Sequence, residues 1–195
     1  LTVRHEQAAG HMADAYFRVA HHPVATLTSC GPGSTNLLTA LASAMMDSSA
    51  MLAITGNVPT SQFNRAPFQE TGRHFQAEFP NVMRPYVKKA FQPTRVEMLP
   101  VTLRQAFKTM LTGRPGPVGI DVPLNCFAEE AEVEVPEPGL WRKGIRTGGS
   151  GTTESVEQAL EMLLSAEKPC ILAGNGAMIS EAGKEIQKLS KLLGI

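Results

Sequence analysis

The sequence predicts an α/β fold: a doubly wound, mostly parallel sheet with helices on both faces, followed by the beginning of a second α/β domain. Short apolar runs bounded by Gly or Pro alternate with helical patterns along the chain. The apolar runs are nearly continuous, which is typical of parallel strands that helices cover on both faces. The alternation is interrupted once, at 129–151, by an acidic, Pro- and Gly-bearing stretch that reads as an exposed crossing between domains.

The individual elements follow in chain order. We expect strands at 23–28, 51–55, 117–122 and 169–173, and helices at 6–20, 35–46, 96–111, 153–165 and 180–193. Leu1-Thr2-Val3 reads as the end of a further strand, and Tyr86, Lys88 and Lys89 fall on a short one. Thr152 or Thr153 is suited to cap a helix, and Gly194 to end one.

These elements group into three regions. We predict a first domain at 1–135, a linker at 136–152, and the start of a second domain at 153–195, which is too small to stand alone. The sequence begins at Leu1, inside an expected core strand, and its last residues end an expected helix. We therefore interpret it as an internal piece of a longer protein.

Bulk composition excludes several function classes. The 18 basic and 18 acidic residues balance, which gives no electrostatic case for nucleic acid or an anionic membrane. No apolar run approaches the ~20 residues of a membrane span. Cys30, Cys126 and Cys170 are odd in number and form no CxxC pair, which favours a reducing, cytoplasmic setting. The histidines show no metal-ligand spacing, so no metal site is predicted on this chain.

A glycine-bearing turn, Ser29–Asn36, joins an expected strand to an expected helix. Its G-x-G-x-x-N spacing is close to that of a dinucleotide-binding turn. The alternative is a tight structural turn capped by Ser34 or Thr35. A dinucleotide is disfavoured because the next strand ends without an acidic residue for the ribose, and because Pro32 removes one backbone N–H.

Glu6 is a candidate catalytic carboxylate. It lies in the first turn of a helix, where the helix dipole favours negative charge, although an isolated Glu there is usually an ordinary surface residue. The small neighbours Ala8, Ala9 and Gly10 indicate close packing, and a partly apolar setting would raise the pKa of Glu6 towards neutrality. Phe68-Gln69-Glu70 lies in a long loop, and long loops in compact domains are usually functional or disordered.

Six segments taken together carry a family resemblance. They are Arg4–Asp14 (RHEQAAGHMAD), Thr28–Asn36 (TSCGPGSTN), Met46–Ser48, Thr55–Pro59, Phe68–Glu70 and Gly113–Val118 (GRPGPV). In this order and at these separations the sequence resembles the thiamine-diphosphate-dependent enzymes of the acetolactate synthase type. The resemblance runs from residue 1 to about 128 and continues into 153–195.

The resemblance implies a different role for each domain. Residues 1–135 would bind the aminopyrimidine ring of thiamine diphosphate, without the first strand and helix of that domain, and 153–195 would begin the central domain. Mg²⁺ would be held by a C-terminal domain that this sequence does not contain, and FAD is a further cofactor of some members. The active site would be shared between subunits of a homodimer or higher oligomer, and the chain alone would be inactive.

The resemblance also implies roles for single residues. Glu6 would hydrogen-bond a pyrimidine ring nitrogen, favour the imino tautomer, and so promote the C2 ylide that attacks a 2-keto acid. Gln69 and Lys88 would share the catalytic site, and Phe68 and Gln69 would reach the substrate. The residues implied beside the cofactor ring are Glu6, Ser29, Gly31, Pro32, Gly33 and Asn36.

Three functional interpretations follow. The leading one is a carboligase or decarboxylase of 2-keto acids that is similar to acetolactate synthase. A second is a member similar to sulfoacetaldehyde acetyltransferase or benzoylformate decarboxylase, because Cys30 and Asn57 differ from the commonest family residues. Glu6 argues against glyoxylate carboligases, which typically lack it. The third is a truncated, non-catalytic binding or oligomerisation module.

Overall fold

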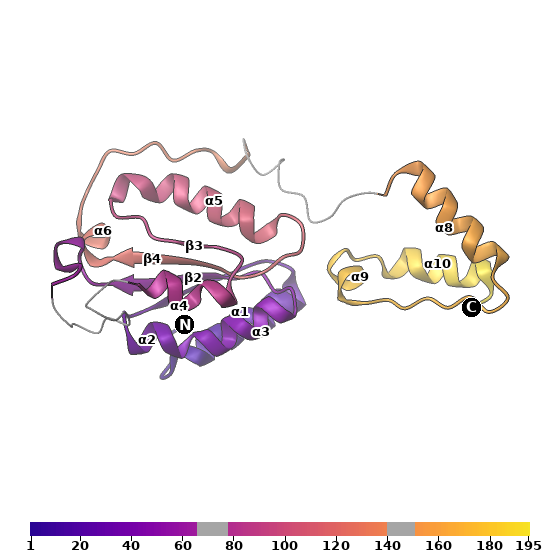
Figure 1. Cartoon of the computed structure of the whole chain (residues 1–195), viewed down its shortest axis with the longest axis horizontal. Coiled ribbons are helices and arrows are strands. Elements are labelled where there is room, and N and C mark those ends of the chain that lie inside the picture. The colour runs from indigo at the N-terminus through magenta and orange to yellow at the C-terminus, as the bar shows by residue number, and fades with distance from the viewer. Residues whose placement is uncertain (66–77, 140–150) are drawn as a thin grey trace. The chain divides into compact units, whose positions relative to one another are not determined.

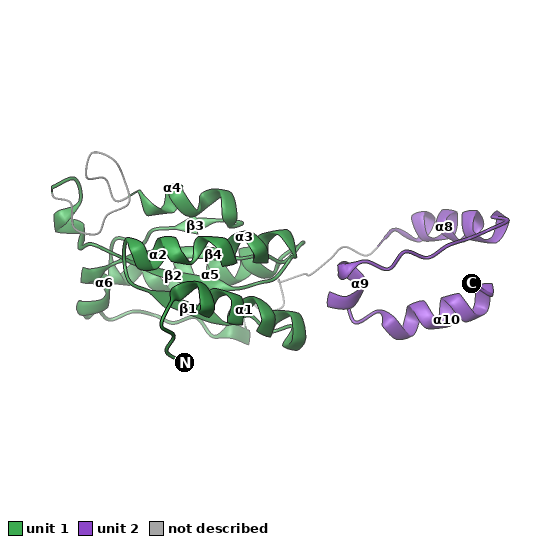
Figure 2. Cartoon of the chain, turned by 90° about the horizontal axis from the view of Figure 1, so that it is seen from below, with its two compact units in different colours: residues 1–146 green, residues 147–195 purple. Residues whose placement is uncertain are grey.

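The computed structural model describes residues 1–65, 78–139 and 151–195, and the chain divides into two compact units, 1–146 and 147–195 (Figure 2). Unit 1 contains a four-stranded parallel sheet in the order β1-β2-β4-β3. Its strands are β1 (Ala25–Thr28), β2 (Leu52–Asn57), β3 (Ala90–Phe91) and β4 (Val118–Pro123). Because all strands are parallel, their carboxyl ends meet at one edge of the sheet, which we call the carboxyl edge.

Helices cover both faces of this sheet, as predicted (Figure 1). On one face lie α1 (Glu6–Ala20), α3 (Leu38–Met46) and α4 (Phe79–Met83), and on the other lie α5 (Leu99–Leu111) and α6 (Leu124–Ala128). The described residues of unit 1 form two apolar clusters, and Phe17 of α1 joins the second. Buried Leu37, Leu41 and Met83 belong to the first, and Ala106 and Met110 to the second. The sequence patterns at 6–20, 23–28, 51–55 and 117–122 are therefore confirmed, to within two residues at each end.

Some expected helices are divided in the structure. The pattern at 35–46 forms α2 (Pro32–Asn36) and then α3, because Pro32 supplies a preset φ at the start of an earlier helix. The pattern at 96–111 begins as a 3₁₀ turn, Val96–Met98, before α5. The expected strand around Tyr86–Lys89 is displaced, since Tyr86 ends a 3₁₀ turn and β3 starts at Ala90.

Unit 2 consists of helices among its described residues. They are α8 (Thr153–Ser165), α9 (Asn175–Ile179) and α10 (Gly183–Leu193). Thr152 caps α8 by accepting from the Ser155 N–H at 3.2 Å, and Gly194 ends α10 at φ 70°, both as predicted. None of the residues described in this unit is buried. Nowhere in the described chain is a helix both long and apolar enough to cross a membrane.

The predicted strand at 169–173 is wrong. The segment has no regular structure, and Leu172 is 96% exposed. A strand requires a neighbour to complete its hydrogen bonds, and no other strand is present among the described residues of unit 2. Leu1–Val3 likewise forms no strand.

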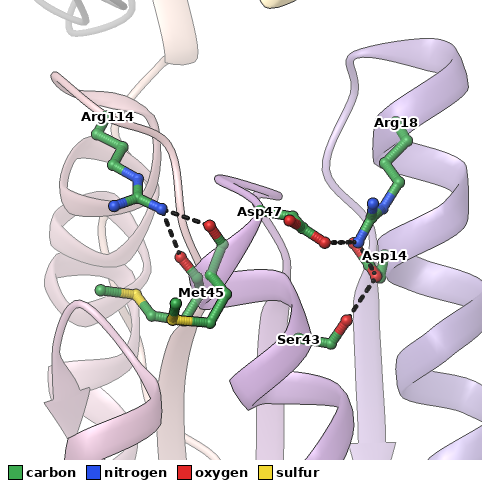
Figure 3. Close-up of polar contacts among 7 residues, drawn as sticks. Asp14, Arg18, Ser43, Met45, Asp47 and Arg114 are labelled. Atoms are coloured by element: carbon green, nitrogen blue, oxygen red, sulfur yellow. Dashed lines mark hydrogen bonds and ion pairs between the residues drawn. The ribbon is translucent and has the colours of Figure 1, made fainter. Parts of the chain in front are cut away.

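Close contacts fix α1 against α3. Gly10 allows the two helices to approach, because a Cβ on Gly10 would lie 2.4 Å from the Cβ of Ala40. Arg18 of α1 donates to Asp14 on its own helix at 2.8 Å and to Asp47, at the end of α3, at 2.6 Å (Figure 3). Arg114 donates to the carbonyl oxygens of Met45 and Met46, the last residues of α3. This packing determines where the first turn of α1 lies.

Candidate functional site

The turn after β1 has a backbone that only glycine adopts readily. Gly31 precedes α2 with φ 63° and ψ −116°, outside the regions open to residues with a Cβ. Pro32 follows as the first helical residue. The predicted caps, Ser34 and Thr35, are not caps. Ser34 lies buried inside α2, where its hydroxyl donates to the carbonyl oxygen of Ser29 at 2.6 Å.

Glu6, the first residue of α1, faces this turn. Its Oε2 accepts a hydrogen bond from Nδ2 of Asn36 at 3.0 Å, although the two residues are 30 positions apart. Gly33 is equally close, because a Cβ added there would lie 3.1 Å from Oε1 of Glu6 and 3.3 Å from the Cβ of Ser29. The structure thus brings Glu6, the turn and Asn36 together, and the sequence resemblance implies that all three lie beside one ligand.

The pKa of Glu6 is shifted in the direction opposite to the expectation. The hydrogen bond from Asn36 is the largest cause and lowers the pKa, and a backbone hydrogen bond at the start of α1 lowers it further. Partial burial acts the other way and is outweighed. The predicted rise is wrong because the hydrogen bonds from the Asn36 amide and from the backbone outweigh the effect of the partly apolar surroundings on the pKa. Glu6 is accordingly ionised at neutral pH.

Glu6 also lines a cavity of about 780 Å³ between α1 and β1. Its walls are formed mainly by apolar side chains of Val3, Ala9, Met12, Tyr16 and Leu27. Such a volume is typical of sites for small molecules, which combine apolar walls with a few placed polar groups.

A second cavity of about 540 Å³ lies at the carboxyl edge. Thr28–Cys30 at the end of β1 and Gly56–Pro59 at the end of β2 form one side, and Leu124 and Phe127 of α6 form another. Ser29 lines both cavities, so the turn before α2 borders each of them.

Lys88 lies elsewhere. Its Nζ donates to the carbonyl oxygen of Thr112 at 2.8 Å, and its backbone N–H donates to that of Pro117 at 2.8 Å. Pro117 precedes β4, so Lys88 lies at the amino edge of the sheet, opposite Glu6. The prediction that the two share a site is not supported within this chain, because a residue preceding a parallel strand lies at the strand's amino end. Desolvation lowers the pKa of Lys88.

The remaining predicted site residues, Phe68 and Gln69, fall outside the described residues. Within the described ranges, no group of three or more His, Cys, Asp or Glu side chains is placed to hold a metal ion.

Sequence reasoning missed one buried polar centre. Asp121 of β4 is fully buried and accepts hydrogen bonds from Thr55, Asn57 and Gln92. Burial is the largest influence on its pKa and raises it, although the three hydrogen bonds act in the opposite direction. A charged residue inside the apolar run 117–122 was the signal that could have identified it.

Comparisons with known proteins identify a matching domain and relatives of this chain. Residues 1–78 match the family "Thiamine pyrophosphate enzyme, N-terminal TPP binding domain". The chain is 38% identical over its whole length to the "Probable acetolactate synthase large subunit" of Methanococcus aeolicus, and 38% identical over 97% of its length to the "Acetolactate synthase" of Arthrospira platensis. It spans 32% of the length of each of these relatives.

A solved structure extends the likeness to the fold. The thiamine diphosphate-dependent 4-hydroxybenzoylformate decarboxylase of Rhodococcus jostii RHA1 superposes with a TM-score of 0.83 at 26% identity, over 97% of this chain and 35% of the decarboxylase. The domain match, the relatives and the shared fold together show that this chain is homologous to part of the thiamine-pyrophosphate-dependent enzymes, with an N-terminal TPP binding domain match at residues 1–78 and acetolactate synthases among its relatives.

Proposed function

We propose that this chain supplies the pyrimidine-ring side of a thiamine diphosphate site in an enzyme that acts on 2-keto acids, and that Glu6 is its catalytic carboxylate. The observation that carries the proposal is the position of Glu6, which is held by Asn36 beside the Gly31–Gly33 turn and borders a cavity of about 780 Å³.

The residues present fit a flat, nitrogen-bearing ring. Asn36 binds Oε2 of Glu6, and Gly33 places no side chain beside Oε1. An ionised carboxylate there can accept a hydrogen bond from a ring N–H, and can take up or return the proton at that ring nitrogen. Ser29 and Pro32 would border the ring. When bound, thiamine diphosphate supplies an electron sink for the loss of CO₂ and the carbon that forms the new bond.

The relatives favour one reaction class and support a second as the alternative. The acetolactate synthases among them support a carboligase, and the likeness to a 4-hydroxybenzoylformate decarboxylase supports simple decarboxylation as the alternative.

Phe68 and Gln69 remain the predicted substrate residues. We further propose that residues outside this chain hold Mg²⁺ and any FAD, that two or more subunits share the site, and that the chain alone is inactive. We also propose a cytoplasmic location, on the odd number of cysteines and the lack of a CxxC pair in the sequence.

The test uses the full-length protein that carries these residues, loaded with thiamine diphosphate and Mg²⁺. Replacement of Glu6 by Gln removes the ionisable group but keeps its size. We expect exchange of the cofactor C2 proton with D₂O, followed by NMR, to slow by about 100-fold or more. The matched control is Glu97→Gln, which alters an exposed carboxylate paired with Arg95 and should leave exchange unchanged. Equal exchange rates in the Glu6→Gln variant and the parent would contradict the assignment. Exchange no faster than that of free cofactor in the parent itself would instead favour a non-catalytic module.

A further inference from the structure

Asp121 connects three segments at the carboxyl half of the sheet. Its Oδ1 accepts from the hydroxyl of Thr55 at 2.8 Å, and its Oδ2 accepts from Nδ2 of Asn57 at 2.5 Å and Nε2 of Gln92 at 2.8 Å. Thr55 and Asn57 belong to β2, and Gln92 follows β3. A carboxylate that is fully buried is costly unless such donors surround it, so its position in β4 calls for an explanation.

Asn57 extends this network into the turn after β2. The backbone N–H of Val58 donates to Oδ1 of Asn57 at 2.8 Å, so one side chain binds both Asp121 and the turn. Farther along, the N–H of Thr60 donates to Oδ1 of Asn125 in α6 at 2.9 Å. The segment Gly56–Pro59, which comprises the end of β2 and the start of the turn that follows it, is therefore held on both sides.

The Gly56–Pro59 segment supports the residues that precede Gly31. A Cβ added to Gly56 would lie 3.3 Å from the carbonyl oxygen of Thr28 and 3.4 Å from the backbone nitrogen of Cys30. The backbone of Gly56 thus packs directly on the end of β1. The residues that precede Gly31 include Ser29, which contacts Ser34 of α2 and lies beside Gly33 and so beside Glu6.

We propose that Asn57 is a positioning residue for the Glu6 site: anchored by Asp121, it fixes the segment Gly56–Pro59, against which the backbone that leads into Gly31 and α2 is seated. Asn57 touches neither Glu6 nor the cavity that Glu6 lines, and acts through the contacts between them. The catalytic part of this inference rests on the proposed function, whereas its structural part does not.

The network offers matched variants. Asn57→Ala removes a donor to Asp121 together with the acceptor for Val58. Thr55→Val also removes one donor to Asp121, but Thr55 makes no bond to the turn. Asp121→Asn is the conservative variant, since its oxygen can still accept from Asn57 and Gln92 while its amide donates to Thr55. Only Asn57→Ala disconnects the turn.

The first experiment is amide hydrogen exchange of the 195-residue chain, followed by mass spectrometry. In Asn57→Ala we expect peptides covering 28–31 and 56–60 to exchange about 10-fold faster, and peptides covering α3 to keep the parent rate. Thr55→Val and Asp121→Asn should stay within about threefold of the parent throughout. Unchanged exchange at 28–31, or an equal rise in α3, would overturn the proposal, because either result means that Asn57 has no specific hold on the turn.

The second experiment measures cofactor C2 proton exchange in the full-length protein at saturating thiamine diphosphate. A loosened turn displaces groups around Glu6, and misplacement of about 1 Å can cost up to about 100-fold, so we expect Asn57→Ala to slow exchange by about 10-fold or more. Thr55→Val and Asp121→Asn should retain the parent rate. If Glu6→Gln has no effect, the proposed function fails while the amide result still stands. If Glu6→Gln is slow but Asn57→Ala matches the parent, the positioning role is overturned.

Discussion

At the scale of the residue, the side chain that decides the chemistry of Glu6 is Asn36. The helix dipole at the start of α1 favours a carboxylate, but a first-turn Glu is common and needs no function. The bond from Asn36 is different, because it comes from another helix and fixes the direction in which the carboxylate points. Two weak features of the sequence, a Glu and an Asn 30 positions apart, thus become one arrangement.

Replacement of Asn36 by Ala should raise the pKa of Glu6 towards its ordinary value of 4.5, because the largest cause of the lowered pKa is removed. A lowered pKa in the folded state stabilises the protein above the unfolded-state pKa, and this contribution is lost as the pH falls through the folded-state value. The measurement is an NMR titration of the Glu6 carboxyl carbon. Thr35→Ala is the control, since Thr35 bonds to Pro32 and not to Glu6. An unchanged midpoint in Asn36→Ala would show that Asn36 does not set the pKa.

The sequence allowed prediction of most of the described site but not of its surroundings. Glu6 and the Gly31–Gly33 turn could be found because ordered short motifs mark them. The direction of the Glu6 pKa shift could not, since it depends on one bond from Asn36. Lys88 was associated with Glu6 although it precedes a parallel strand, and only strand direction shows that such a residue lies at the opposite edge of the sheet. Asp121 escaped because its partners are contributed by different strands.

At the scale of the element, the contact between α1 and α3 places Glu6. Gly10 and Ala40 bring the helices into close contact, while Arg18 and Arg114 bind the end of α3 from two sides (Figure 3). Arg114 satisfies carbonyl oxygens that a helix end leaves without partners. The position of the first turn of α1 is therefore determined by packing along its length.

Gly10→Ala should destabilise unit 1 by about 1 to 3 kcal/mol, because the added methyl group would overlap the Cβ of Ala40 and force the helices apart. Urea unfolding followed by circular dichroism measures the change. Adding Ala40→Gly restores the space, so the double variant should lose less stability than the two single variants together. Strict additivity of the two changes would mean that the helices do not meet at this point.

Arg18→Met should destabilise the protein by about 1 to 3 kcal/mol at pH 7, because Asp14, whose side chain is 7% exposed, loses its charged donor. Burial alone would raise the pKa of Asp14, but hydrogen bonds led by that from Arg18 outweigh it and hold the pKa low. The stabilisation is thus fully present above the unfolded-state pKa of about 3.9 and is lost as the pH falls through the lowered folded-state pKa.

Urea unfolding at pH 7 and pH 3 checks this pH dependence. The difference in free energy of unfolding between the Arg18→Met variant and the parent should be smaller at pH 3 than at pH 7. Arg95→Met, which removes an exposed pair with Glu97, should change stability by about 0.5 kcal/mol or less at either pH. A difference that is independent of pH would assign the effect to lost packing of the Arg18 stem instead of to charge.

The accuracy of the element predictions depended on whether a partner lay within reach. The runs at 23–28, 51–55 and 117–122 form strands because each has a parallel neighbour that completes its hydrogen bonds. The run at 169–173 has the same apolar character and no neighbouring strand in the part of unit 2 that the structure describes. The local sequence pattern indicates that a segment prefers a strand conformation. Whether the strand forms depends on a neighbouring strand that can complete its hydrogen bonds.

At the scale of the whole molecule, the two units differ in how they are stabilised. Unit 1 buries apolar residues on both faces of its sheet, and every residue of β4 is buried. The described residues of unit 2 include none that is buried, and α8 and α10 present exposed apolar side chains such as Met162, Leu164 and Leu192. Helices of this length are marginal in water when tertiary packing does not support them.

This contrast predicts unequal protection of the backbone within one molecule. In amide exchange of the 195-residue chain at neutral pH, peptides from α8 and α10 should exchange within about tenfold of unfolded rates. Peptides from β2 and β4 should be slowed at least about 1,000-fold, since they open only when unit 1 unfolds. Protection of α8 equal to that of β4 would contradict the expectation, because it would require its exposed apolar side chains to be covered in solution. The strands of unit 1 serve as the internal control for both results.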